Sequence, residues 1–259
     1  MDRIESKNND FLKEVKKLKE KKYRIKKQCF LVEGIRFVIE ALDSKFFIEA
    51  LVVSDKFLKG FYELEIDFLN LKNTRIVSVS DDIFNGLCDT ENPQGILAVV
   101  KNKDLKVLGE RGFYILADKL QDPGNMGTII RTAHAAGALA VIITKGTVDI
   151  YNEKTLRSTM GSIFRMPIIE DKDLEVVKNL QDKGFKLVTS TLDTDKNFFE
   201  VDLNQDIIIS VGNEGNGISN ELRELSDIEV KIPMPGNAES LNAAVAASIM
   251  MYEVVRQNI

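Results

Sequence analysis

The chain has 259 residues, 44% of them hydrophobic, which is enough for two domains of ordinary size with sizeable cores. No apolar run approaches the roughly 18–20 residues that cross a bilayer, and the basic N-terminus lacks the apolar stretch of a secretory signal, so we expect a cytoplasmic protein without membrane contact. One histidine, His134, and two distant cysteines, Cys29 and Cys88, exclude most histidine-based metal sites and a disulfide framework, and we expect no bound metal.

The net charge of −5 hides a basic segment near the N-terminus. Between Phe11 and Lys27, nine basic residues face two acidic ones, which leaves about +7 on this short stretch. Such a local positive field binds phosphate even in an acidic protein. The candidate contacts to RNA phosphates are Lys16, Lys17, Lys21 and Arg24. A solvated helix face would explain the same charges.

The first hundred residues alternate helices and strands. The predicted elements are a helix over roughly 8–22, a strand at Cys29–Val32, a helix at Gly34–Leu42, a strand near Phe47–Val53, helical pieces around a strand at Arg75–Val79, and a strand at Gly95–Val100. The polar stretch that follows has no periodicity and is typical of a linker. We therefore expect one domain over 1–101, a linker over 102–111 and a second domain over 112–259.

The second half alternates more regularly. Strands are predicted at 113–118, 139–144, near Met166–Ile169, at Phe185–Ser190 and at 207–211, with helices after the turn at 122–125, near 153–163, over 172–183 and from about Leu241. Strands separated by helices predict a parallel sheet that is covered on both faces.

Residues 116–138 combine a strand end, a turn and a helix. Pro123 restricts the backbone of the turn, and Asn125 is predicted to cap the helix that follows. Arg131 lies off the apolar stripe of that helix, one turn beyond Gly127, whose missing side chain leaves room above the guanidinium. An ordinary strand–turn–helix with one exposed arginine would show the same pattern.

A glycine-rich loop follows the predicted strand at 207–211. Its glycines, Gly212, Gly215 and Gly217, would let a ligand approach the backbone, but their spacing matches neither the dinucleotide fingerprint nor a P-loop. Glu214 within the loop would repel a phosphate, which favours a ligand without phosphates, such as an adenosine that carries a cationic sulfonium. A plain tight turn is the alternative.

The last segment, 230–257, is a proline-containing loop followed by a helix unusually rich in alanine. Ser240 is predicted to cap this helix. Small side chains permit the close approach of another element or of a partner subunit, and a well-packed terminal helix needs them as well.

Taken in order, these segments resemble the three signature motifs of the SpoU/TrmH methyltransferases: D-P-x-N-x-G-x-x-x-R-T-A, then G-x-E-G-x-G, then I-P-M-x-G with S-L-N-x-A-V-A. The stretch around Arg157, Ser158 and Gly161 is also similar to that family. The N-terminal half resembles, more loosely, the family's substrate-binding domain, through F-L-V-E-G near 30–34 and P-Q-G-I-L-A-V-V at 93–100.

The resemblance implies a homodimeric enzyme that transfers a methyl group from S-adenosylmethionine to a ribose 2′-hydroxyl of structured RNA, with ribosomal RNA favoured over transfer RNA. It implies an α/β fold: a C-terminal parallel sheet with helices on both faces and a trefoil knot, and a smaller N-terminal α/β domain similar to ribosomal RNA-binding proteins. Nothing in the spacing predicts the knot.

By the same resemblance, Arg131 lies at the ribose and its phosphate. The polar residues that complete the catalytic site are Asn125, Glu214, Ser240 and Asn242. The residues expected around the cofactor are Thr189, Ser190, Gly212, Asn213, Gly215, Ile232, Pro233 and Leu241. Lys154 and Arg157 join the candidates for RNA binding.

Two other classes of function stay open at this point. An RNA-binding or assembly protein on the same fold could lack activity, although the intact motif residues disfavour it. A nucleotide-dependent oxidoreductase is disfavoured by the glycine spacing and by Glu214, and it would bind NAD in place of S-adenosylmethionine.

Overall fold

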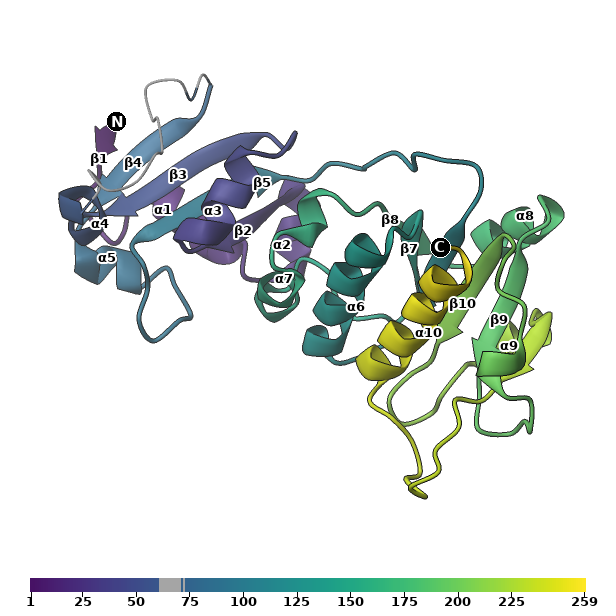
Figure 1. Cartoon of the computed structure of the whole chain (residues 1–259). Helices are drawn as coiled ribbons and strands as arrows, with labels where there is room; N and C mark the ends of the chain where they lie inside the picture. The colour runs from purple at the N-terminus through teal and green to yellow at the C-terminus, as the bar shows by residue number, and fades with distance from the viewer. Residues whose placement is uncertain (61–70, 72) are drawn as a thin grey trace. The chain divides into compact units, whose positions relative to one another are not determined.

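The computed structural model describes residues 1–60, 71 and 73–259, which form two compact units (Figure 1). The first unit comprises Met1–Lys103 and Tyr151–Arg157, and the second comprises Asp104–Ile150 and Ser158–Ile259. Residues 151–157 therefore pack with the first unit, although the chain on both sides of them belongs to the second.

A five-stranded sheet in the order β1-β4-β3-β5-β2 forms the centre of the first unit. The strands are β1 (Asp2–Arg3), β2 (Cys29–Glu33), β3 (Ile48–Ser54), β4 (Arg75–Val79) and β5 (Ile96–Lys101). β1, β4 and β3 are parallel, whereas β5 runs antiparallel to both β3 and β2. Only β1 was not predicted, because two exposed residues carry no periodic signal.

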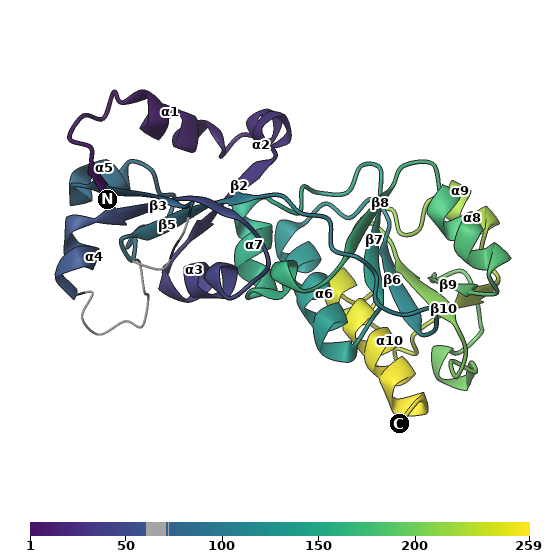
Figure 2. The ribbon, with the colours of Figure 1, turned by 90° about the horizontal axis from the view of Figure 1, so that it is seen from above.

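The described helices of the first unit cover both faces of its sheet (Figure 2). They are α1 (Asp10–Lys17), α2 (Lys21–Lys27), α3 (Ile35–Leu42), α4 (Asp55–Gly60), α5 (Asp81–Asn85) and most of α7 (Glu153–Thr159). Leu12 and Val15 of α1 pack with Ile83 and Phe84 of α5 in a core on one face of the sheet. This small α/β unit agrees with the predicted fold class.

The single helix predicted over 8–22 is wrong, because the structure has two helices there. Glu20 has an extended backbone with φ −92° and ψ 130°, so the chain breaks between α1 and α2. Arg24 stabilises the break, since its Nη1 donates to the carbonyl oxygens of Leu18 (2.8 Å) and Lys19 (2.6 Å), which the ended helix leaves without partners.

The second unit contains a six-stranded, fully parallel sheet in the order β11-β9-β10-β6-β7-β8. Its strands are β6 (Phe113–Ala117), β7 (Ala140–Thr144), β8 (Ile168–Asp171), β9 (Lys186–Ser190), β10 (Ile207–Val211) and β11 (Ile228–Val230). β6 and β10 are central neighbours and are buried throughout. The predicted parallel sheet is confirmed, with β11 as an addition that was too short to predict.

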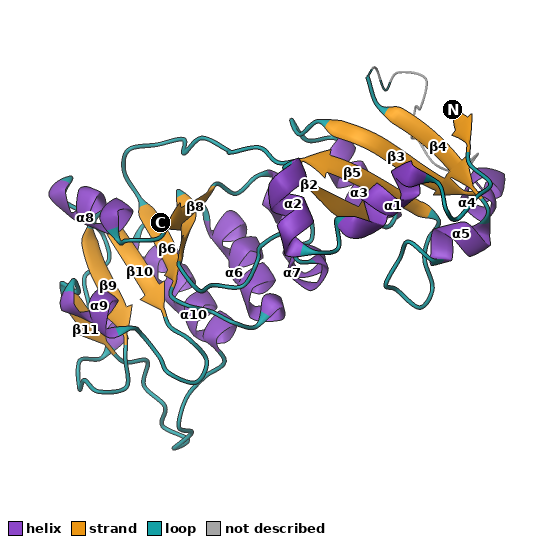
Figure 3. Ribbon diagram, turned by 180° about the vertical axis from the view of Figure 1, so that it is seen from behind, coloured by secondary structure: helices purple, strands orange, loops and turns teal. Residues whose placement is uncertain are grey.

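Helices cover both faces of this sheet, as predicted (Figures 2 and 3). On one face lie α6 (Pro123–Ala136) and α10 (Ala243–Gln257), which pack against each other, and on the other lie α8 (Glu175–Asp182) and α9 (Asn220–Glu224). Two short 3-10 helices, η3 (Ser162–Phe164) and η4 (Phe198–Glu200), complete the unit. The predicted helix 153–163 ends at Thr159 because Met160 (φ 49°) and Gly161 (φ 87°) both leave the helical region. Within the described part of the chain, no helix has the length and apolarity to span a membrane.

Two predicted helix caps are wrong. Asp122, not Asn125, caps α6, since its Oδ1 accepts the backbone N–H of Asn125 at 2.8 Å. Asn242, not Ser240, caps α10, since its Oδ1 accepts from Ala244 (2.9 Å) and Val245 (3.2 Å). Because Asn125 already lies in the first turn of α6, its side chain is available for contacts outside the helix.

Candidate active site

A cavity of about 820 Å³ lies in the second unit, where β9 and β10 end. Its lining comes from the end of β9 and the loop after it (190–193), the glycine-rich loop after β10 (212–218), and the loop and first turn of α10 (239–243). The carboxyl ends of parallel strands meet at one edge of a sheet, and ligands of open α/β folds bind there. The topology therefore brings together the second and third sequence motifs.

The glycine-rich loop is a tight, prebuilt structure. Asn213 and Gly217 exchange backbone hydrogen bonds of 2.9 Å, which folds the loop back on itself. A Cβ at Gly212 would lie 2.1 Å from the carbonyl carbon of Gly217, so no other residue fits at that position. The Asn213 side chain accepts from the N–H groups of Gly215 and Asn216, both at 3.0 Å, and donates to the Lys119 carbonyl at 2.9 Å.

A chain of polar side chains connects this loop to the N-termini of α6 and α10. Glu214 accepts from Asn125 Nδ2 at 3.0 Å, and Asn125 Oδ1 accepts from Asn242 Nδ2 at 2.8 Å. A carboxylate only accepts, so it sets the orientation of the Asn125 amide, and that amide in turn sets the orientation of Asn242. These three predicted catalytic residues therefore form one hydrogen-bonded chain.

Glu214 is held by backbone groups that directly precede α6. Its two oxygens also accept the N–H groups of Gln121 (3.1 Å) and Asp122 (3.0 Å). Partial burial alone would raise the pKa of the carboxyl, but the hydrogen bonds from Asn125 and these amides outweigh it and lower the pKa below its ordinary value. Glu214 is thus a carboxylate at neutral pH and a weak proton acceptor.

Arg131 lies on α6 with an exposed side chain. Among the residues that the structure describes, its guanidinium has no hydrogen-bond or ion-pair partner, and in particular none with Glu214. Gly127, one turn earlier, is buried. Arg131 therefore presents all of its donors to solvent, in a form ready for a bidentate contact with a phosphate or carboxylate.

Most residues predicted to surround the cofactor line the cavity. They are Ser190, Gly212, Asn213, Gly215, Ile232 and Leu241, and the predicted catalytic residues Glu214, Ser240 and Asn242 lie in the same lining. Thr189 does not, because its fully buried side chain points away and its hydroxyl bonds Ser226 Oγ at 2.6 Å. Pro233 is exposed beside Ile232 and is also outside the lining.

Asp193 and Arg223 line the cavity although no motif singled them out. Arg223 donates twice to Glu229 (2.7 and 3.0 Å) and once to Asp193 (2.8 Å), and these bonds raise the pKa of its guanidinium above the ordinary value. The two residues are far apart in sequence, so no spacing rule would pair them. In the described part of the chain, no cluster of three or more His, Cys, Asp or Glu residues is arranged to hold a metal ion.

The residues predicted to bind RNA phosphates have different surroundings. Lys16 and Lys21 are exposed, and no described residue pairs with either ammonium. Lys17 forms an ion pair with Glu14 at 3.1 Å. Lys154 is exposed on α7, and Arg157 donates to Glu153 at 2.7 Å.

The structure reassigns Arg24 from the phosphate contacts. Its side chain is only 6% exposed, and its guanidinium binds carbonyl oxygens at the end of α1. Its charge is therefore used inside the fold.

Both halves of the chain match known protein families. A sequence model described as the SpoU rRNA Methylase family matches residues 112–252, and one described as the MRM3-like substrate binding domain matches residues 9–98. The chain is 38% identical to the Bacillus subtilis 23S rRNA (guanosine(2553)-2′-O)-methyltransferase RlmP over 98% of this chain and 99% of that protein. It is 32% identical to a 23S rRNA (uridine(2479)-2′-O)-methyltransferase of Streptomyces viridochromogenes, with 99% and 93% covered.

Solved structures agree with this placement. An AdoMet-bound rRNA methyltransferase from Sinorhizobium meliloti superposes with a TM-score of 0.87 at 29% identity, covering 99% of this chain and 98% of that one. AviRb from Streptomyces viridochromogenes, in complex with AdoMet, superposes with a TM-score of 0.85 at 30% identity, covering 96% and 98%. The matched motifs and the matched fold agree, and the chain belongs to the SpoU rRNA Methylase family.

Proposed function

We propose that this chain transfers a methyl group from S-adenosylmethionine to a ribose 2′-hydroxyl of ribosomal RNA. The observation that carries the proposal is the prebuilt cavity at the glycine-rich loop. Two of its lining residues, Glu214 and Asn242, are connected by hydrogen bonds through Asn125. Two relatives that cover nearly the whole chain are named as 23S rRNA 2′-O-methyltransferases. This support favours ribosomal over transfer RNA.

The residues of the cavity suit S-adenosylmethionine. A volume of about 820 Å³ lies within the range of small-molecule sites, and the absence of a side chain at Gly212 lets the loop fold tightly along the wall of the cavity. The lining carries three carboxylates, Asp193, Glu214 and Glu239, against the single guanidinium of Arg223, which suits a cationic ligand and opposes a phosphate. We assign the binding to Ser190, Gly212, Asn213, Gly215, Ile232 and Leu241. When bound, the cofactor supplies the methyl group on a positively charged sulfur.

The chain's own residues act mainly by positioning, since in-line transfer to an oxygen needs little covalent assistance. The hydrogen bonds from Glu214 through Asn125 to Asn242 hold the starts of α6 and α10 at the rim of the cavity. Arg131 binds the RNA phosphate and stabilises the negative charge that develops on the ribose oxygen. In this proposal Arg131 is an electrostatic stabiliser rather than a base, since a guanidinium offers hydrogen-bond donors and no acceptor.

The first unit selects the RNA in this proposal. We assign substrate binding to residues 1–101, with 102–111 as a linker and 112–259 as the methyltransferase domain. Lys16, Lys17 and Lys21 supply phosphate contacts, with Lys154 and Arg157 as further candidates. The proposal places the enzyme in the cytoplasm, and the trefoil knot is an expectation from the resemblance.

We also propose a homodimer that forms through α10. Val245 is 47% exposed and Tyr252 is 51% exposed, and a spacing of seven residues places both on one side of the helix. Apolar side chains on one exposed helix face fit a second copy of the same helix.

The test uses the purified protein, tritiated S-adenosylmethionine and transcripts of ribosomal and transfer RNA, followed by nucleoside analysis. Label in a 2′-O-methylnucleoside of the ribosomal transcript is the expected result. Label on a base would retain the cofactor and overturn the ribose mechanism. Absence of label together with absence of cofactor binding by calorimetry would overturn the proposal as a whole.

Arg131→Ala separates the RNA side of the site from the cofactor side. We expect turnover to fall by at least about 100-fold, because a preorganised charge at the transition state is removed. Cofactor affinity should stay within about twofold, since Arg131 does not line the cavity. Arg111→Ala is the matched control, because Arg111 is an exposed arginine of the same unit, paired with Asp206 away from the site. A loss of cofactor binding in Arg131→Ala would contradict the assignment.

A further inference from the structure

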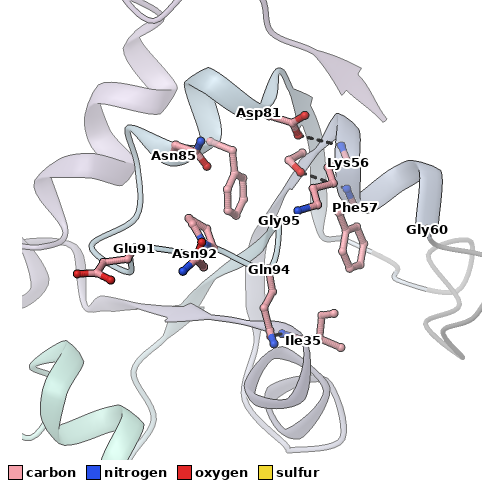
Figure 4. Close-up of a pocket in the computed structure, with 13 residues that line it drawn as sticks. Ile35, Lys56, Phe57, Gly60, Asp81, Asn85, Glu91, Asn92, Gln94 and Gly95 are labelled. Atoms are coloured by element: carbon pink, nitrogen blue, oxygen red, sulfur yellow. Dashed lines mark hydrogen bonds between the residues drawn. The ribbon is translucent and has the colours of Figure 1, made fainter.

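A second hollow, of about 510 Å³, lies in the first unit at the carboxyl end of β3 (Figure 4). The loop 91–95, the start of α3 and residues of α4 and α5 form its walls. None of its lining residues belongs to α1 or α2, so it is separate from the basic segment described above. The cofactor cavity belongs to the other unit.

The floor of this pocket is rigid. Gly95 has φ +83°, and a Cβ there would lie 2.6 Å from Ser54 Oγ and 2.8 Å from Phe57 Cβ, so only glycine allows this close packing. The Ser54 N–H donates to the Gly95 carbonyl at 2.8 Å, and Ser54 Oγ accepts the N–H of Phe57 at 3.2 Å. The end of β3 and the loop 91–95 are thereby held together.

Three amide side chains lie around the opening (Figure 4). Gln94 Oε1 accepts the backbone N–H of Ile35 at 2.8 Å, which fixes the amide and leaves Nε2 as a donor. Asn85 and Asn92 are exposed, and neither side chain bonds to any residue within the described ranges. Amides present a donor and an acceptor side by side, which is the pattern that pairs with the edge of a nucleobase.

The charges of the pocket oppose a phosphate ligand. Lys56 is the single cation of its lining, and Asp81 and Glu91 contribute two carboxylates. Asp81 Oδ1 accepts the backbone N–H of Lys56 at 2.8 Å, whereas the Lys56 side chain extends into the pocket (Figure 4). Phe57 and Phe84 add apolar wall. A flat, uncharged ring with hydrogen-bonding edges fits this combination better than an anion.

We propose that this pocket receives one unpaired nucleobase of the substrate RNA, from a nucleotide other than the methylated one. The inference rests on the proposed function and deepens it, since the first unit would then recognise the identity of a base in addition to binding phosphates. Proteins that recognise RNA by sequence do so mainly at unstacked bases in loops and bulges, where withdrawing a base from its neighbours costs least. Asn85, Asn92 and Gln94 bind the edge of the base, and Lys56 contributes one further donor.

The test is the double variant Asn85→Ala/Asn92→Ala in the full chain, assayed on a transcript of large-subunit ribosomal RNA. We expect the KM for RNA to rise about tenfold, with kcat and S-adenosylmethionine affinity unchanged within about twofold. Asn8→Ala is the matched control, because Asn8 is an exposed asparagine of the same unit outside the pocket. For the single variant Lys56→Ala we expect a smaller rise in the KM for RNA, and Lys45→Ala is its matched control.

Probing of the ribose reactivity of every nucleotide supplies a second readout. Wild-type protein and Asn8→Ala should change the reactivity of one unpaired nucleotide that the double variant leaves unchanged. If the double variant keeps both the wild-type KM and the wild-type pattern of ribose reactivity, the proposed base pocket is wrong. Methylation by the wild-type protein would still uphold the proposed function in that case. A raised KM with the wild-type pattern of reactivity would also overturn the base pocket, because the effect would then be indirect. An inactive wild-type protein would overturn both proposals.

Discussion

The Asn242 side chain makes three hydrogen bonds with one amide group. Its Oδ1 accepts from Ala244 and Val245 at the start of α10, and its Nδ2 donates to Asn125. The oxygen therefore contributes to the stability of the helix, whereas the nitrogen contributes to the alignment of the site. At this residue the two contributions can be separated by substitution.

Asn242→Asp retains an oxygen that caps the helix and removes the donor to Asn125. We expect its thermal stability to stay close to wild type, because Asp and Asn are comparable N-caps, and its turnover to fall roughly tenfold for the loss of about 1.4 kcal/mol of alignment. Asn242→Ala should lose the same turnover and also about 1 kcal/mol of stability. Thermal unfolding and the methylation assay measure both quantities. Full turnover in Asn242→Asp would show that the bond to Asn125 does not orient the site.

The helices α1 and α2 differ from an ordinary solvated surface in how their charges are paired. Glu14 forms ion pairs with both Lys17 (3.1 Å) and Lys27 (2.7 Å), whereas Lys16 and Lys21 have no acidic partner among the described residues. The aromatic ring of Tyr23 lies under the ammonium groups of Lys17 and Lys22. Lys16 and Lys21, exposed on the same two helices as the partly exposed Tyr23 ring, form a surface suited to RNA.

Lys16→Glu/Lys21→Glu tests this surface. We expect weaker RNA binding and a shallower dependence of log affinity on log salt, by roughly 0.7–0.9 for each phosphate that the protein no longer neutralises. Titrations at several salt concentrations measure the slope, with Lys178→Glu of the second unit as the control. Arg24→Ala should instead lower the stability of the fold and leave the slope unchanged, because its guanidinium is buried. An unchanged slope in the double variant would show that these helices form an ordinary solvated surface that does not bind RNA.

At the scale of the whole molecule, Val245 and Tyr252 form an apolar strip of α10 that no described residue covers, and the proposed dimer accounts for it. Val245→Glu/Tyr252→Glu places two carboxylates on this strip, where a second copy would have to bury them at a cost of several kcal/mol. We expect a monomer by analytical ultracentrifugation, against a dimer for wild type. Leu108→Glu is the control, since Leu108 is 88% exposed and lies outside α10. A wild-type monomer at micromolar concentration would contradict the proposal.

The architecture of the second unit was predictable because its strands are buried on both faces. Segments such as Phe113–Ala117 and Ile207–Val211 are continuous apolar runs, and helical segments separate them, which favours a parallel sheet. The short strands β1 and β11 were not predictable, since two or three residues depend on their neighbours in the sheet. The helix caps were wrong by two or three residues because several polar residues in each turn compete for the same role, and only the observed backbone decides among them.

The sequence by itself determined which segments are candidates for the chemistry: the turn before Arg131, the glycines around Glu214, the alanine-rich last helix and the basic N-terminal segment. Only the tertiary structure decided which of them meet. Asn125 bonds Glu214 across 89 residues and Asn242 across 117, whereas Thr189 and Arg24 are buried away from their predicted partners. Periodicity and capping are local properties of a chain, so they specify elements and their exposed faces. Contacts over such separations follow from the order of strands in the sheet, which the packing of the whole fold determines.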